Sequence, residues 1–91
     1  MFKPEYTARF KKDYKLIQKR GYKLDALREV IRKLLNDETP LPQNNKDHEL
    51  NGEFAGYREC HVGPDWLLIY YYKVEDVIVF ARTGTHSDLF K

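Results

Sequence analysis

The sequence has one cysteine, Cys60, and no long hydrophobic run, because its longest apolar stretch covers only residues 66–72. A single cysteine excludes an internal disulfide and fits a reducing compartment, and a thiol within a strand pattern is typically packed in the core. The apolar stretch is far shorter than the ~20 residues of a membrane-spanning helix. The chain opens Met-Phe-Lys, which is not the pattern of a signal peptide. We therefore expect a cytoplasmic protein with no membrane partner.

Internal repeats and low-complexity segments are also lacking. The 91 residues are 42% hydrophobic and 14% aromatic, which is enough for a globular chain and argues against disorder. A chain of this length buries only about 60–65% of its unfolded surface, so the core is modest. We expect residues 1–91 to form a single domain.

The net charge of +2 conceals an uneven distribution. Residues 1–36 hold 11 Lys/Arg against 4 Asp/Glu, a net +7, whereas residues 37–91 hold 5 against 10, a net −5. A basic first part favours contact with a polyanion such as nucleic acid or a ribosome. The same charges are equally consistent with ordinary solvated helix faces.

The first part of the chain predicts one strand and two helices. Alternation over residues 2–6 indicates a short edge strand, where a proline is tolerated. Thr7 suits the N-cap of a helix that runs to residue 20 and stops at Gly21. A second helix is indicated by an apolar stripe made of Leu24, Leu27, Ile31, Leu34 and Leu35. The short link between the helices favours an antiparallel hairpin.

The second part predicts strands. Residues 37–55 are interpreted as a long connection, with His48 on it, because Pro and Asn interrupt any regular pattern. Strands are expected at 57–62, 66–72 and 77–83, followed by a short tail over residues 84–91. The middle strand is apolar on both faces and should be central. The fold class is therefore α+β in the order β-α-α-β-β-β, with two N-terminal helices packed on a mainly antiparallel sheet.

All three histidines, His48, His61 and His86, lie in this second part. Histidine both takes and gives a proton near neutral pH, because its unperturbed pKa is about 6.5. RNA is cleaved when its 2′-hydroxyl attacks the adjacent phosphorus, which requires a base, an acid and a group that stabilises the phosphate charge. Histidines combined with Arg or Lys supply all three, provided that the fold brings them together.

Each candidate has a plainer alternative. His86, where the last strand should end, is a proton-transfer candidate or a surface histidine in a tail. Arg82 suits bidentate phosphate binding or an internal salt bridge. Asp65 is placed to orient His61 across the hairpin turn, but it is also an ordinary turn residue.

Trp66 and Phe90 are candidates for stacking on bases, although core packing is the better default for Trp66. The position of Lys46 near His48 does not by itself indicate a binding site. A metal site is not expected, because separations of 13 and 25 residues between the histidines match no short ligand spacing, and Cys60 lacks a CxxC partner.

Three segments together resemble a known family. They read Lys-Asp-His-Glu-Leu at 46–50, Gly-Tyr-Arg-Glu-Cys-His-Val-Gly-Pro-Asp-Trp-Leu-Leu-Ile-Tyr at 56–70, and Arg-Thr-Gly-Thr-His-Ser-Asp-Leu-Phe at 82–90. This pattern closely resembles the YafQ branch of the RelE-type toxins, the endoribonuclease halves of bacterial type II toxin–antitoxin pairs. The similarity covers nearly the whole chain.

The resemblance implies a RelE-like fold and a ribosome-dependent mRNA interferase that cuts codons in the A site without a metal or other cofactor. It makes His86 the general acid and Arg82 the phosphate-stabilising group. The remaining acid–base or orienting groups are His48, His61 and Asp65, with the base unassigned. Phe90 and Trp66 match aromatic positions at or near the site, and Lys46 and Arg58 are secondary phosphate contacts.

The resemblance also implies a cognate antitoxin, usually a ribbon-helix-helix dimer of the DinJ type, whose C-terminal segment wraps the toxin. Operator DNA would then be bound only through the antitoxin, while the toxin itself would meet the ribosome and mRNA. The alternative is a non-catalytic module that binds RNA or the antitoxin.

Overall fold

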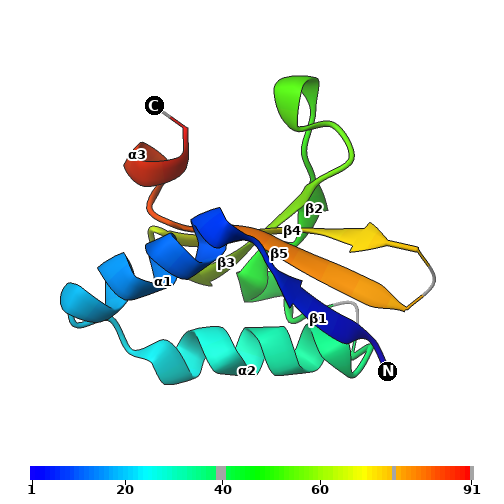
Figure 1. Ribbon diagram of the computed structural model, residues 1–91, viewed down its shortest axis with the longest axis horizontal. Helices are drawn as coiled ribbons and strands as arrows, with labels where there is room; N and C mark the ends of the chain where they lie inside the picture. Colours follow the sequence, from blue (N-terminus) through cyan, green and yellow to red (C-terminus); the bar gives the residue numbers. More distant parts are fainter. Residues whose placement is uncertain (39–40, 75, 91) are drawn as a thin grey trace.

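The computed structural model describes residues 1–38, 41–74 and 76–90 and confirms the predicted α+β class (Figure 1). Along the chain its elements are β1 (Lys3–Tyr6), α1 (Ala8–Lys19), α2 (Leu24–Leu35), the 3₁₀ turn η1 (Gln43–Asn45), β2 (His48–Glu49), the 3₁₀ turn η2 (Gly52–Phe54), β3 (Arg58–Gly63), β4 (Trp66–Lys73), β5 (Val77–Gly84) and α3 (His86–Leu89). No helix in these three ranges is long and apolar enough to span a bilayer.

The described strands form one sheet in the order β1-β5-β4-β3-β2. Strand β1 pairs parallel with β5, and the other pairings are antiparallel. Strand β4 is central, as its two apolar faces predicted, and β1 lies at an edge, where Pro4 is tolerated.

Helices α1 and α2 cover one face of the sheet. Thr7 caps α1, since its Oγ1 accepts from the Phe10 backbone N at 3.0 Å and donates to the Ala81 carbonyl at 2.8 Å. Gly21, at φ +81°, ends the helix in the left-handed region, as predicted. The main core lies under the helices and includes Phe10, Ile17, Leu27, Leu34, Cys60, Trp66, Leu68, Tyr70, Ile78 and Phe80. Cys60 is fully buried, and burial raises the pKa of its thiol.

The opposite face of the sheet carries a smaller cluster made of Leu67, Ile69, Ala81 and Leu89, against which Leu50 and Tyr57 pack. In Figure 1, α3 and η2, the green coil at the top, both stand on the side of the sheet away from α2. This face is only partly covered, so it is the face on which polar side chains of the strands remain accessible.

Two expectations from the sequence are wrong. Residues 37–55 are not a connection without strands, because His48 and Glu49 form β2, which pairs with β3. Residues 84–91 are not a plain tail, since α3 forms there, although residue 91 lies outside the described ranges. Both elements are too short to show a periodic pattern, and tertiary contacts stabilise them.

Candidate active site

The fold brings the three histidines together on the sheet face opposite α1 and α2. Side chains alternate along β3, and Cys60 lies in the core under the helices, so Glu59 and His61 point to the other face. His48 on β2 is paired with Glu59 in the register of the sheet. His86 begins α3, and its ring centroid lies 6.0 Å from that of His61.

A buried carboxylate lies between two of these histidines. Glu59 is 6% exposed, and its Oε1 lies 3.6 Å from Nε2 of His48 and 3.9 Å from Nε2 of His61. The Nδ1 of His48 lies 2.8 Å from the Lys46 carbonyl oxygen, which only accepts, so Nδ1 donates. Glu59 was not among the residues predicted for the site, although a glutamate two residues before His61 in a strand necessarily shares its face.

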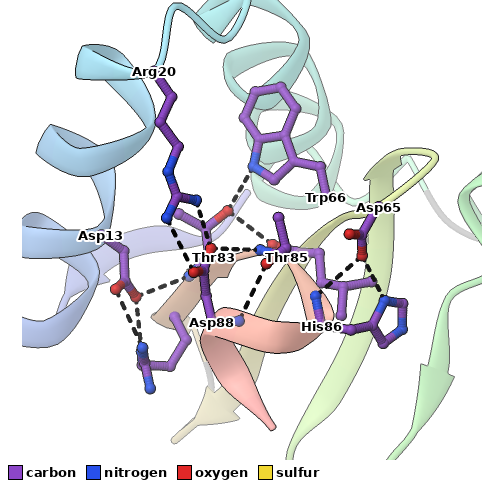
Figure 2. Close-up of polar contacts among 10 residues, drawn as sticks. Asp13, Arg20, Asp65, Trp66, Thr83, Thr85, His86 and Asp88 are labelled. Atoms are coloured by element: carbon purple, nitrogen blue, oxygen red, sulfur yellow. Dashed lines mark hydrogen bonds and ion pairs between the residues drawn. The ribbon is translucent and has the colours of Figure 1, made fainter. Parts of the chain in front are cut away.

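Asp65 contacts His86 and not His61, which corrects the pairing expected across the hairpin turn. Its Oδ1 accepts from the His86 backbone N at 3.1 Å and lies 2.7 Å from Nδ1 of the ring (Figure 2). A carboxylate only accepts, so Nδ1 carries the hydrogen and Nε2 is left for a substrate. These hydrogen bonds from His86 hold the pKa of Asp65 below its usual range.

His61 has a depressed pKa. Partial burial is the main cause, and the positive charges of Lys46 and His86 add to it, while Glu59 acts in the opposite direction. Lys46 and His61 line the same pocket of about 400 Å³. Asn45 of η1 donates to the His61 carbonyl at 2.6 Å and so ties this part of the connection to β3.

The two aromatic candidates lie in different environments. Phe90 is 39% exposed, and its ring centroid is 6.3 Å from that of His86, beside the histidines. Trp66 is 7% exposed, and its Nε1 donates to the buried hydroxyl of Thr83 at 2.9 Å (Figure 2). Trp66 therefore corresponds to the core-packing alternative, because its ring is not available to stack on a base.

Each arginine candidate is held by a carboxylate. Arg82 forms the salt bridge that was one of its two alternatives: Nε donates to Oδ2 of Asp13 at 2.7 Å and Nη2 to Oδ1 at 3.2 Å. Strand β5 has a bulge next to Arg82, because Phe80 opposes Tyr70 and Arg82 opposes the adjacent Ile69.

Arg58 lies on the helix side of the sheet, because it alternates with Glu59 along β3. Its Nε donates to Asp47 Oδ1 at 3.3 Å, and the hydroxyl of Tyr70 donates to the same oxygen at 2.7 Å. The structure therefore does not bring Arg58 together with the three histidines.

Helix α3, which carries His86, is held by a capping box and by α1. The Asp88 backbone N donates to Thr85 Oγ1 at 3.1 Å, and the Thr85 N donates to Asp88 Oδ2 at 2.9 Å. Arg20 of the α1 C-cap pairs with the same carboxylate (Figure 2). Gly84 allows this arrangement, since a Cβ there would lie 2.9 Å from Asp88 Oδ2. The Thr-x-x-Asp pattern at 85–88 was the available sequence signal for this turn.

Neighbouring imidazoles and carboxylates on one face of a rigid sheet define a site for proton transfer. Comparison with known proteins agrees with the motifs in the sequence. The profile of the family described as "Bacterial toxin of type II toxin-antitoxin system, YafQ" matches residues 2–91. The mRNA interferase toxin YafQ of Escherichia coli K12 is 47% identical over 87 residues, which cover 94% of this chain and 92% of the relative.

Solved structures are similar over the full length. The crystal structure of YafQ from E. coli BL21(DE3) has a TM-score of 0.93 at 42% identity and covers 100% of both chains. The E. coli DinJ–YafQ complex has a TM-score of 0.92 at 43% identity, again over 100% of both chains. The chain therefore belongs to the YafQ family of bacterial toxins of type II toxin–antitoxin systems.

Proposed function

We propose that this toxin is a ribosome-dependent endoribonuclease that cleaves mRNA in the A site and so halts translation. The reaction is acid–base attack of a 2′-hydroxyl on the neighbouring phosphorus, and the protein side chains supply the proton transfers. The observation that carries the proposal is the gathering of three histidines and two carboxylates on one sheet face. The activity is that of an mRNA interferase.

His86 is the general acid. Asp65 keeps Nδ1 protonated and fixes the ring, so Nε2 faces the substrate and delivers its proton to the departing 5′-oxygen. This contact performs the orienting role that a carboxylate has beside a catalytic histidine in other acid–base sites. Phe90 lies next to the ring and stacks on a base of the message.

His61 is the general base. Its lowered pKa keeps the imidazole neutral at pH 7, so it accepts the proton of the 2′-hydroxyl. The 2′-oxygen then bonds to phosphorus as the bond to the 5′-oxygen breaks, and the proton from His86 makes the leaving oxygen a 5′-hydroxyl, with a cyclic phosphate on the other fragment. Glu59 orients His61 and His48 from beneath.

Lys46 and Arg82 stabilise the phosphate charge. Lys46 lines the same pocket as His61. Arg82 donates two hydrogen bonds to Asp13, and one of them must be replaced by a hydrogen bond to a phosphate oxygen. Each group adds positive charge where the transition state becomes more negative. Arg58 is only a secondary, peripheral phosphate contact, because it lies on the other face of the sheet.

The proposed partner is a cognate antitoxin, a ribbon-helix-helix dimer like DinJ, and the E. coli relative has been crystallised with DinJ. The net charge of +7 over residues 1–36 is complementary to an acidic antitoxin segment as well as to ribosomal RNA. Operator DNA is bound through the antitoxin. The site of action is the cytoplasm, where ribosomes translate. The alternative function is a non-catalytic module that binds RNA or the antitoxin.

The test compares inducible wild type, His86→Ala and Ser87→Ala, and maps new 5′ ends on translated messages. Ser87 is exposed on the same helix turn and serves as the matched control. We expect in-frame cuts with the wild type and with Ser87→Ala, and none with folded His86→Ala. In-frame cuts that persist in His86→Ala would show that His86 is not the general acid. If wild type makes no cuts, the non-catalytic binding module is favoured.

A further inference from the structure

A second pocket on the histidine face takes no part in the proposed proton transfers. It has a volume of about 300 Å³, at the lower end of the range for small-ligand pockets, ~300–1,000 Å³. Its floor is the sheet, and its walls come from η2 and the first turn of α1. The side chains that matter here are Arg9, Glu53, Phe54, Tyr57, Ile69 and Arg82.

The register of the sheet connects this pocket to the histidines. His48 opposes Glu59, Glu59 opposes Ile69, and Ile69 opposes Arg82, so one row crosses β2, β3, β4 and β5. Neighbouring strands lie about 4.8 Å apart, so the row spans about 14 Å of sheet. Of the three histidines the row contains His48, and an RNA strand laid along it runs from the histidine site to the pocket.

Aromatic rings lie between His86, the proposed general acid, and the pocket. The ring of Phe90 lies 6.3 Å from His86 and 5.3 Å from Phe54, and Phe54 lies 6.2 Å from Tyr57 (centroid distances). Figure 1 shows the elements concerned, α3 and η2, on the same side of the sheet. Bases of single-stranded RNA stack on such rings without needing a particular sequence.

The charged groups of the pocket suit a nucleotide. Arg9 is exposed and forms no ion pair with any residue in the described ranges, so its guanidinium is available to a phosphate. Glu53 is an exposed acceptor. Adenine, cytosine and guanine offer an exocyclic amino group to such an acceptor, and uracil does not.

We propose that this pocket binds a nucleotide of the message beside the scissile phosphate. Phe54 stacks on its base, Arg9 contacts its phosphate, and Glu53 selects a base with an exocyclic amino group over uracil. The proposal rests on the ribonuclease function argued above and adds a subsite for a neighbouring base.

The test measures single-turnover cleavage of a short message on purified ribosomes, with toxin in excess over message but below saturation. We expect Phe54→Leu to lower the rate by about tenfold, since loss of a base–aromatic stack typically costs about that much. Arg9→Gln should lower it similarly, because it removes a charge-assisted hydrogen bond to phosphate. Phe54→Tyr retains the ring and should retain the rate. The pH profile should stay unchanged in all three variants, because the histidines are untouched. The matched control is Lys73→Gln, an exposed cation of β4 that does not line the pocket.

Base selection is measured with messages that differ only at the nucleotide on either side of the cut. Wild type should discriminate against uridine at one of these positions, and Glu53→Gln should lessen that discrimination. If wild type cuts no message, the ribonuclease function itself fails. If it cuts while Phe54→Leu and Arg9→Gln match its rate, only the pocket proposal is overturned. Lost antitoxin affinity with unchanged cleavage by these variants would instead assign the pocket to the antitoxin.

Discussion

Arg20 and Asp88, 68 residues apart in the chain, form a two-point ion pair: Nη1 lies 2.7 Å from Oδ2, and Nη2 lies 3.1 Å from Oδ1. The pair joins the end of α1 to the short helix α3, whose first residue is His86. A single helical turn does not hold its shape in isolation. The orientation of the proposed acid therefore depends on a contact outside the substrate site.

Weakening this ion pair should slow cleavage. We expect Arg20→Gln to lower the single-turnover rate by about 10- to 100-fold, because small displacements of a catalytic group slow the reaction strongly. The rate of Arg20→Lys should lie between those of Arg20→Gln and wild type, because lysine keeps the charge but not the two-point geometry. The loss should appear in the single-turnover rate constant at saturating toxin, with KM little changed, and this constant does not depend on the fraction of folded protein. The control is Gln18→Ala, an exposed and uncharged neighbour. Equal rate constants for wild type and Arg20→Gln would show that α3 is held by its capping box alone.

The same ion pair makes folding stability depend on acid pH. Hydrogen bonds from Arg20, and then from the Thr85 backbone, lower the pKa of Asp88 in the folded protein. The unfolded value is about 3.9, so this contribution is complete above that pH and is lost as the pH falls through the lower folded value. We expect wild type to exceed Arg20→Gln in free energy of unfolding at pH 6, with a smaller difference at pH 3. Urea unfolding at the two pH values measures both, and a constant difference would exclude this linkage.

The environment of His61 predicts opposite effects from two neighbours. Lys46 lowers the pKa of His61 and Glu59 raises it, in addition to the larger effect of burial. Lys46→Gln should therefore raise this pKa, and Glu59→Gln should lower it. If His61 is the base, the acidic limb of the rate profile moves to higher pH in the first variant and to lower pH in the second. NMR titration of the imidazole checks the pKa directly, and Lys23→Gln is a distant control. Shifts of the same sign in both variants would contradict the electrostatic account.

The sequence predicted the elements that carry a regular pattern. Helices α1 and α2 and strands β3, β4 and β5 appear at their expected places, within one or two residues at each end. Their periodicities of 3.6 and 2 reflect burial of one face or both. The central place of β4 followed from its two apolar faces. Strand β2 covers only two residues and helix α3 only four, so neither is long enough to show a period.

The site residues were predictable as residue types, but their partners were not. Asp65 is four residues from His61 in the sequence, yet it binds His86, which is 21 residues away. Asp13 of α1 holds Arg82 across 69 residues. Such pairs depend on how the helices and the last turn pack on the sheet, which local patterns do not encode. Glu59 is the exception, since alternation along β3 alone places it beside His61.

The two aromatic positions in the motifs should behave in opposite ways. Trp66 is buried, and its Nε1 donates to Thr83 Oγ1, which in turn donates to the Leu67 carbonyl at 2.8 Å. Trp66→Phe removes the donor and leaves a gap, so we expect it to lower the free energy of unfolding by about 1–3 kcal/mol while folded protein still cleaves at nearly the wild-type rate.

Phe90 is exposed beside His86, so Phe90→Leu should cost little stability but slow cleavage by about tenfold through lost stacking. Urea unfolding and single-turnover rates on the same preparations separate the two effects. A Trp66→Phe protein that is as stable as wild type but cleaves poorly would place the indole at the substrate, against its burial. A Phe90→Leu protein that cleaves normally would leave the exposed ring without a role in RNA binding.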